Sequence, residues 1–174
     1  MSIYVKTRFG GAIYKRLLPF IDAVDALPDR HFTFTSDGFE PLSLEFLECT
    51  FNGCPVYGMM HYYTQNGDLM RDPDMSFLVD RESACIVPMS YEMSALGTYQ
   101  EVFDGEPEAV RRGLLSELSD FMNTWTKNIL AQGFDPKQAE REAGRDDPEG
   151  PVVPGGPDLS VEITPEKFLE TFCS

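Results

Sequence analysis

Residues 42–68 read LSLEFLECTFNGCPVYGMMHYYTQNGD and carry the pattern that decides the fold. One apolar-rich run leads from Leu42 to Phe51, and a second run from Val56 to Tyr63 answers it. Asn52-Gly53 separates the two runs, and Asn66-Gly67 follows the second. An Asn-Gly pair between such runs is a strong short-range signal of a β-hairpin. The stretch therefore predicts consecutive antiparallel strands.

Further strand patterns extend this arrangement in both directions. Residues 31–35 alternate before it, and residues 75–80, 84–89 and 99–103 follow it. Antiparallel sheets commonly pack one face on a core and leave the other face in water. We expect a meander of four to six strands with one apolar face and one acidic, solvated face.

Two helical patterns flank the strands. The first has apolar residues at steps of three and four, namely Ile13, Leu17, Phe20, Ile21 and Val24. Pro19 lies within this pattern and predicts a kink or a break. The second covers residues 106–132, with an apolar stripe of Val110, Leu114, Leu118, Phe121, Met122, Trp125 and Ile129. The predicted fold class is α+β: an antiparallel β-sheet meander with a long C-terminal helix packed across it and an N-terminal helix.

Composition divides the chain into a domain and a tail. We predict an α+β domain over residues 1–134, an acidic linker rich in Pro and Gly over 135–158, and a short C-terminal helix over 159–174. Of the fourteen residues from 144 to 157, eight are Gly or Pro, which is typical of a linker. Residues 3–5 form a further short alternation, either a strand or a frayed start.

Negative charge dominates the strand region. The formal net charge is −15, and residues 31–110 contain fourteen Asp or Glu but only two cations, Arg71 and Arg81. Such a surface repels phosphate and attracts basic surfaces. This argues against a protein that binds nucleic acid through a patch of its own, and against tyrosines as base-stacking platforms, which normally accompany a positive groove. Two interpretations stay open: a binding surface for a basic partner, or a solvated face that only confers solubility.

The chain shows no pattern of secretion or membrane insertion. Its N-terminus lacks a signal-peptide pattern, and no apolar run reaches the length of a membrane span. Its cysteines, at positions 49, 54, 85 and 173, are expected to be reduced thiols. Cys49 and Cys54 have no second pair to complete a metal site. We expect a cytoplasmic protein without a cofactor and without membrane contact, of open oligomeric state.

The densest polar motif runs from His61 to Met75. A divalent-metal site would need several of its groups to converge, and His61 with Asp68, Asp72 and Asp74 could supply them. Asp72 and Asp74 are two apart, so they would share a face of a strand. The spacing matches no established metal loop, and turn chemistry explains Asn66-Gly67 and Asp72-Pro73.

Other chemistry finds little support in the sequence. His61 with Asp68, or with Glu48 on the paired strand, could provide acid–base catalysis. Phosphate-binding loops and nucleophile elbows have no match in the chain. We therefore predict a protein that is not an enzyme, with no catalytic or metal-ligating residue, and keep a metal-dependent hydrolase built on His61 as the weakest alternative.

The longest distinctive segment of the chain is His61-Tyr-Tyr-Thr-Gln-Asn-Gly-Asp-Leu-Met-Arg-Asp-Pro-Asp-Met-Ser-Phe, accompanied by Pro88-Met-Ser-Tyr, Gly97-Thr-Tyr-Gln-Glu-Val and residues 118–134. Together these segments resemble a domain-of-unknown-function family of conjugative and phage-derived elements. The resemblance covers roughly residues 35–134. It implies an accessory protein of a mobile element and supplies no catalytic residue. By association, such accessory proteins include anti-restriction and anti-CRISPR inhibitors of host nucleases.

These observations together lead to one hypothesis. The protein is a non-enzymatic inhibitor, a DNA mimic that occupies the basic groove of a nucleic-acid-targeting defence nuclease, such as an RNA-guided Cas nuclease. The expected partner-binding residues are seven carboxylates: Glu45, Glu48, Asp68, Asp72, Asp74, Asp80 and Glu82. The alternative is a replication or conjugation accessory module that binds another protein through the Trp125 helix or the segment 168–172.

Overall fold

The computed structural model describes residues 7–103 and 110–144. Its six strands are β1 (His31–Phe34), β2 (Leu42–Phe51), β3 (Cys54–Gln65), β4 (Asp68–Asp80), β5 (Cys85–Met93) and β6 (Thr98–Glu101). Its helices are α1 (Gly10–Asp25), the short 3-10 helix η1 (Ser94–Leu96), α2 (Arg112–Ala131) and α3 (Lys137–Ala143).

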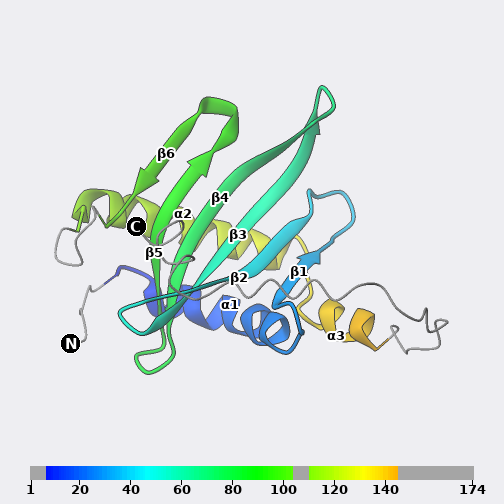
Figure 1. The fold of residues 1–174 in the computed structure, drawn as a ribbon, viewed down its shortest axis with the longest axis horizontal. Helices are drawn as coiled ribbons and strands as arrows, with labels where there is room; N and C mark the ends of the chain where they lie inside the picture. The colour runs from blue at the N-terminus through cyan, green and yellow to red at the C-terminus, as the bar shows by residue number, and fades with distance from the viewer. Residues whose placement is uncertain (1–6, 104–109, 145–174) are drawn as a thin grey trace, which may run out of the picture.

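The strands form one sheet in chain order, β1 to β6, and each neighbour pair is antiparallel (Figure 1). The predicted meander is therefore confirmed, with both Asn-Gly pairs at hairpin turns. β4 begins at Asp68, earlier than the predicted Met75, because Gln65 and Asp68 pair directly across the second turn. β5 likewise extends four residues past the predicted end at Met89.

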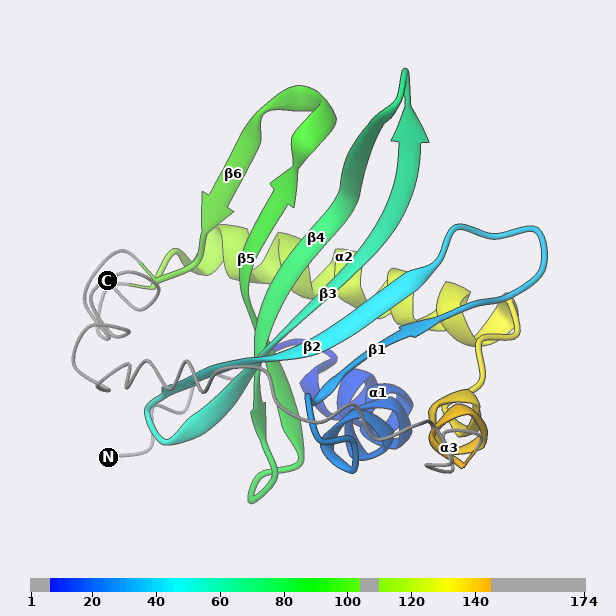
Figure 2. The ribbon, with the colours of Figure 1, turned by 45° about the vertical axis from the view of Figure 1, so that its right-hand side comes forward.

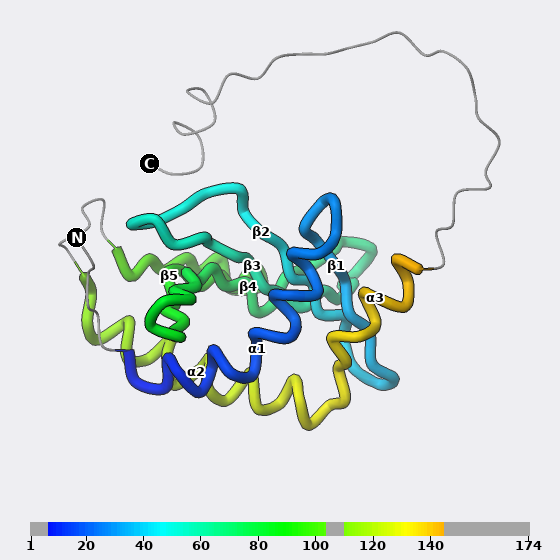
Figure 3. Tube along the Cα trace, turned by 90° about the horizontal axis from the view of Figure 1, so that it is seen from below, coloured from blue at the N-terminus to red at the C-terminus, as the bar shows by residue number. Residues whose placement is uncertain are grey.

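Helices α1 and α2 cover one face of this sheet (Figures 1 and 2). Seen from below, the molecule has a layer of strands and a layer of helices (Figure 3). α1 packs on β5, β2 and α2, and α2 packs on β5. The predicted α+β arrangement is thus confirmed.

The core lies between these two layers. Every apolar residue of the first predicted helical stripe is buried, and α1 continues through Pro19 without a break. α2 begins at Arg112, later than predicted, since Val110 pairs with Phe103 in a β-bridge before the helix. The helix ends before Gly133, whose φ of 81° is the left-handed conformation that terminates many helices.

Part of the predicted linker is helical. Residues 137–143 form α3, which packs on α1 and β1 and buries Ala139 completely. Asp135 stabilises this helix because its carboxylate accepts the Lys137 N–H at 3.0 Å and pairs with Arg141 at 2.9 Å. The linker prediction is therefore wrong for these seven residues. The predicted strand at 3–5 and the predicted helix at 159–174 lie outside the described residues.

No helix within residues 7–103 and 110–144 is long and apolar enough to cross a membrane.

Candidate functional site

Two rows of cross-strand neighbours define the sheet face that points away from the helices. The first row, from β2 to β6, is Glu45, Gly58, Ser76, Ser90 and Glu101. The second row is Ser43, Met60, Asp74, Glu92 and Tyr99. The opposite face carries Met75, which is fully buried, and Tyr91, whose ring contacts Phe121 of α2. We call the outward group of Glu45, Asp74, Glu92 and Glu101 the acidic face.

Asp74 lies in the second row of the acidic face, between Met60 and Glu92, and its surroundings shift the pKa of its carboxyl. Burial raises the pKa of this carboxyl, the charge of Glu92 raises it further, and Glu45 adds to the rise. The positive charge of Arg71, whose guanidinium lies 4.0 Å from the carboxylate, opposes this rise in pKa. Asp74 and Glu92 are direct cross-strand partners, and like charges in that relation are destabilising. The fold therefore keeps a repulsive pair on the sheet face opposite the helices.

The cations of the strand region do not neutralise the acidic face. Arg81 pairs with Asp22 and Asp25 of α1, and within the described residues Arg71 pairs with Asp74 alone. Among the described residues, no ion pair joins Glu45, Glu92 or Glu101 to a Lys or Arg. The negative charge of these side chains is thus available to a partner.

Hydroxyl groups surround these carboxylates. Tyr99, 60% exposed, donates a hydrogen bond to Glu101 at 3.1 Å. Ser76 and Ser90 are cross-strand neighbours whose hydroxyl groups hydrogen-bond to each other. This surface combines carboxylates, hydroxyls and one exposed ring, a set suited to binding cationic side chains rather than phosphate.

Of the seven predicted partner-binding carboxylates, the structure places two on the acidic face, Glu45 and Asp74. Asp68 is at the β3–β4 hairpin turn, and Asp80 is at the other end of the same 13-residue strand. At a rise of about 3.3 Å per residue these ends are about 40 Å apart. Glu82 is exposed in the turn after Asp80. The predicted residues therefore do not form one site.

Two of the remaining carboxylates, Asp80 and Glu48, belong to irregular features of the backbone: a turn and a register shift. Asp80 organises the β4–β5 turn: it accepts the N–H groups of Glu82 and Ser83 and the Ser83 hydroxyl. These bonds, the Ser83 hydroxyl first, lower the pKa of Asp80. Glu48 is exposed at a register shift in β2, with a left-handed φ of 56°.

The expectation that Asp72 and Asp74 share a face is wrong. β4 shifts register here, so that Arg71 lies opposite Tyr62 and Asp74 lies opposite Met60. Tyr62 and Met60 are two apart on β3, which puts Arg71 and Asp74 on the same face instead. Asp72 acts on Tyr91, on the helix side: burial raises the pKa of Tyr91 and the charge of Asp72 raises it further.

His61 links the sheet to α2. Its Nε2 accepts the indole N–H of Trp125 at 3.0 Å, and its Nδ1–H donates to the carbonyl oxygens of Glu40 and Pro41. Both ring nitrogens are therefore engaged, away from the predicted partners Asp68 and Glu48. Within the part of the chain that the structure describes, no group of three His, Cys, Asp or Glu side chains is arranged to hold a metal ion.

Like His61, the candidate pair of Cys49 and Cys54 is poorly suited to metal binding. Cys54 and Cys85 are free thiols. Burial raises the pKa of Cys54, and the charges of Asp80 and Glu82 raise it further. A metal ligand must be a thiolate, which these surroundings disfavour.

Sequence reasoning missed Glu92, Glu101, Ser90 and Tyr99. A signal was present, since Ser90 and Glu92 continue the two-residue alternation of β5 beyond Met89. The prediction ended that strand too early and did not assign its last polar residues to a face.

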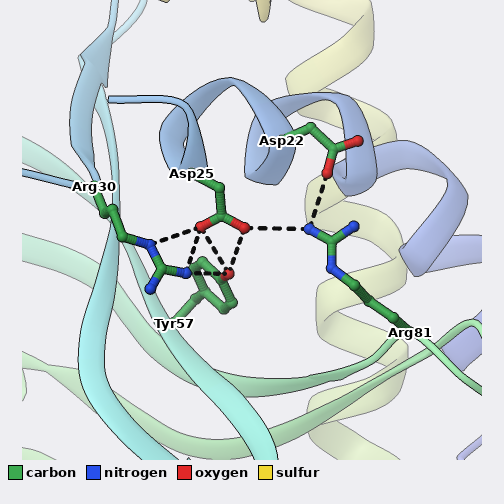
Figure 4. Close-up of polar contacts among 5 residues, drawn as sticks. All are labelled: Asp22, Asp25, Arg30, Tyr57 and Arg81. Carbon is green, nitrogen blue, oxygen red and sulfur yellow. Dashed lines mark hydrogen bonds and ion pairs between the residues drawn. The ribbon is translucent and has the colours of Figure 1, made fainter. Parts of the chain in front are cut away.

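A second polar cluster lies where the C-terminal end of α1 meets the sheet (Figure 4). Asp25 accepts hydrogen bonds from Tyr57 at 2.9 Å, from Arg30 at 2.7 Å and from Arg81 at 3.2 Å. Arg81 also bonds Asp22 at 2.9 Å. Burial, with Asp25 next in effect, raises the pKa of Tyr57 to about 12. Two aspartates balance two arginines here, so this cluster ties α1 to the sheet and offers little charge to a partner.

A family model matches residues 12–135: the domain of unknown function DUF6908. The chain belongs to this family, and the match contains α1 from Ala12 onward, the whole sheet and α2. Comparison with curated proteins gave no significant match. Comparison with solved structures gave none either.

Proposed function

We propose that this member of the DUF6908 family is a protein-binding module whose acidic face occupies the basic groove of a nucleic-acid-binding protein. In its specific form the partner is a host defence nuclease, such as an RNA-guided Cas nuclease, and the protein is a cytoplasmic, non-enzymatic inhibitor carried by a mobile element. The observation that supports the proposal is the outward sheet face on which Glu45, Asp74 and Glu92 lie together and on which, among the described residues, Asp74 alone of the three forms an ion pair, with Arg71 at 4.0 Å.

The dimensions of this face suit such a role. From β2 to β6 there are four interstrand spacings of about 4.8 Å, so the carboxylates extend over about 19 Å. A nucleic acid strand presents one phosphate per about 3.4 Å along the axis of a duplex. The acidic face therefore covers about the length of six phosphate positions, enough to compete for several lysines and arginines of a groove.

Charge complementarity has a kinetic consequence as well. Opposite potentials accelerate association, and salt screens this effect over about 10 Å at 0.1 M. An interface built on exposed carboxylates should therefore weaken as salt rises.

The test is capture of partners from a lysate of a defence-bearing bacterium with three tagged proteins. These are the parent, a face variant (Glu45→Gln, Asp74→Asn, Glu92→Gln) and a control variant (Glu117→Gln, Asp120→Asn, Glu142→Gln). The control residues are exposed on α2 and α3, and both variants lose the same charge. We expect the parent and the control to capture a basic nuclease complex at low salt and the face variant to lose it.

Two results would oppose the proposal. Equal capture by both variants would show that the acidic face is not the binding surface. Captured nuclease that still cleaves DNA at full rate would show that binding is not inhibitory.

The accessory-module alternative keeps α2 as a docking element through its exposed Phe121 and Leu130, but not through the side chain of Trp125. Trp125 is only 7% exposed and bonds His61 within the core, so its side chain is not available to a partner. The other element, residues 168–172, lies outside the described residues. Recovery of replication or conjugation proteins in the same capture experiment would support this alternative.

A further inference from the structure

The two edges of the sheet differ in how they are covered. At the β1 edge, Gln138 of α3 accepts the Thr35 N–H at 2.9 Å and donates to the Thr35 hydroxyl at 2.7 Å. This side chain caps the chain directly after the strand, and α3 packs against β1. At the other edge β6 pairs with β5 on its inner side only, within the described part of the chain.

Just after β6 the chain makes one further antiparallel bridge and then leaves the sheet. Phe103 pairs with Val110 in an antiparallel bridge, and Arg111 N–H donates to the Val102 carbonyl at 2.8 Å. The chain then enters α2 at Arg112, so it does not continue alongside Thr98–Glu101. Among the described residues, no strand therefore pairs with the outer edge of β6, which lies next to a short piece of strand that already sets a direction of pairing.

β6 has two of the devices that usually protect an edge strand, since it is only four residues long and bears Glu101, but it lacks others. Natural edges are blunted by shortness, charged side chains such as lysine, proline, bulges or a covering element. Thr98-Tyr99-Gln100-Glu101 has neither lysine nor proline, and its last three residues are exposed. Threonine and tyrosine also favour extended structure.

We infer that the outer edge of β6 binds an extended, lysine- or arginine-bearing segment of the partner as an additional strand. This inference rests on the proposed function, since it names how the partner engages the acidic face. Side chains of an added strand alternate between the two faces, so every second one would lie beside Tyr99 and Glu101. Cationic residues at those positions would meet Glu101 and, one strand further in, Glu92.

Charge complementarity selects this occupant over a second copy of the chain. Pairing of two β6 edges would bring together two molecules that each carry a formal charge of −15. A basic segment instead gains backbone hydrogen bonds and opposite charges together.

The experiment uses two synthetic eight-residue peptides of alternating lysine and threonine. One has an ordinary backbone, and the other has methyl groups on the backbone nitrogens of its threonines, so the charge is the same. Affinity for the full chain is measured by calorimetry, and amide hydrogen exchange locates the bound peptide. We expect slower exchange within residues 98–101 and an affinity about tenfold to thirtyfold lower for the methylated peptide, from the loss of about two backbone hydrogen bonds.

Matched variants distinguish the charge of Glu101 at the β6 edge from negative charge elsewhere on the protein. Glu101→Gln should weaken binding of the ordinary peptide, whereas Glu117→Gln, an exposed change on α2, should not. Equal affinity of the two peptides, unchanged exchange at 98–101, or no binding of the ordinary peptide at low salt would overturn the edge inference. A dimer formed through β6, detected by light scattering, would also overturn it. In each case a lysate capture that still depends on Glu45, Asp74 and Glu92 would leave the proposed function standing.

Discussion

Replacing Asp74 with asparagine should make the protein more stable and, at the same time, a weaker binder of basic partners. Asp74 has a side chain only 20% exposed, lies opposite Glu92, and has a raised pKa. A carboxyl group whose pKa is higher in the folded state than in the unfolded state costs stability whenever it is ionised. Asparagine keeps the shape of the side chain and removes that charge.

The magnitude follows from two opposing effects. A like-charge pair directly across two strands costs about 0.2–1 kcal/mol, and partial burial of Asp74 adds to this cost. The ion pair with Arg71 is long, at 4.0 Å, and that arginine is 55% exposed, so it contributes a few tenths of a kcal/mol, at the lower end of the range for surface pairs. We expect Asp74→Asn to stabilise the fold by about 0.5–1 kcal/mol at neutral pH, which raises Tm by about 2–3 °C.

The dependence on pH gives the sharper measurement. Both states of Asp74 are protonated well below the unfolded pKa of 3.8, so the difference between parent and variant should vanish there. The stability difference between variant and parent should grow as pH rises from 3.8 towards the raised pKa of Asp74 in the folded state. Above that pKa the difference should remain constant. Urea unfolding at a series of pH values measures it, and Glu92→Gln should give a similar gain that is not additive with the first.

Two results would refute this reasoning. A destabilisation of Asp74→Asn at neutral pH would show that the Arg71 pair outweighs the repulsion. An equal gain from Asp120→Asn, an exposed aspartate on α2, would show that general net charge, and not the Asp74–Glu92 pair, sets the effect.

Two further predictions concern the polar contacts that join the layers. His61→Ala should destabilise the fold by about 2–3 kcal/mol, since the nearly buried Trp125 N–H loses its acceptor, and the fluorescence of Trp125 should change in the folded state. An unchanged emission spectrum and unchanged stability would contradict the role given to His61. Tyr57→Phe should cost about 1.5 kcal/mol through the lost bond to Asp25. Because the pKa of Tyr57 rises from 10.0 to about 12, the parent should lose stability between those pH values and the variant should lose less, as followed by circular dichroism.

The fold could be predicted because its signals are local. The Asn-Gly pairs at residues 52–53 and 66–67 set both hairpins, and the apolar steps of α1 set its buried face. Predictions from local sequence were wrong where tertiary contacts determine the secondary structure. Pro19 does not interrupt α1, and α3 forms in a segment of linker-like composition because Ala139 is buried against neighbouring elements.

The site could be predicted only in part, because residue type does not specify which face of a strand a side chain occupies. A one-residue shift of register moves a side chain to the other face. Such a shift separates Asp72 from Asp74, although they are two apart in sequence. His61 shows the same limit: its type suggested chemistry, but its position opposite Trp125 makes it a link between β3 and α2.

The position of Asp74 also bears on the alternative that the acidic face serves solubility alone. Solubility depends on net charge and is served equally by fully exposed carboxylates such as Glu117 and Asp120. It gains nothing from a half-buried aspartate placed directly opposite Glu92. A partner that supplies a cation to this pair would relieve the repulsion on binding. The free energy that the repulsion costs the unbound protein would then add to the favourable free energy of binding. A stabilising Asp74→Asn change that also abolishes capture of the partner would favour a binding surface over a merely solubilising one.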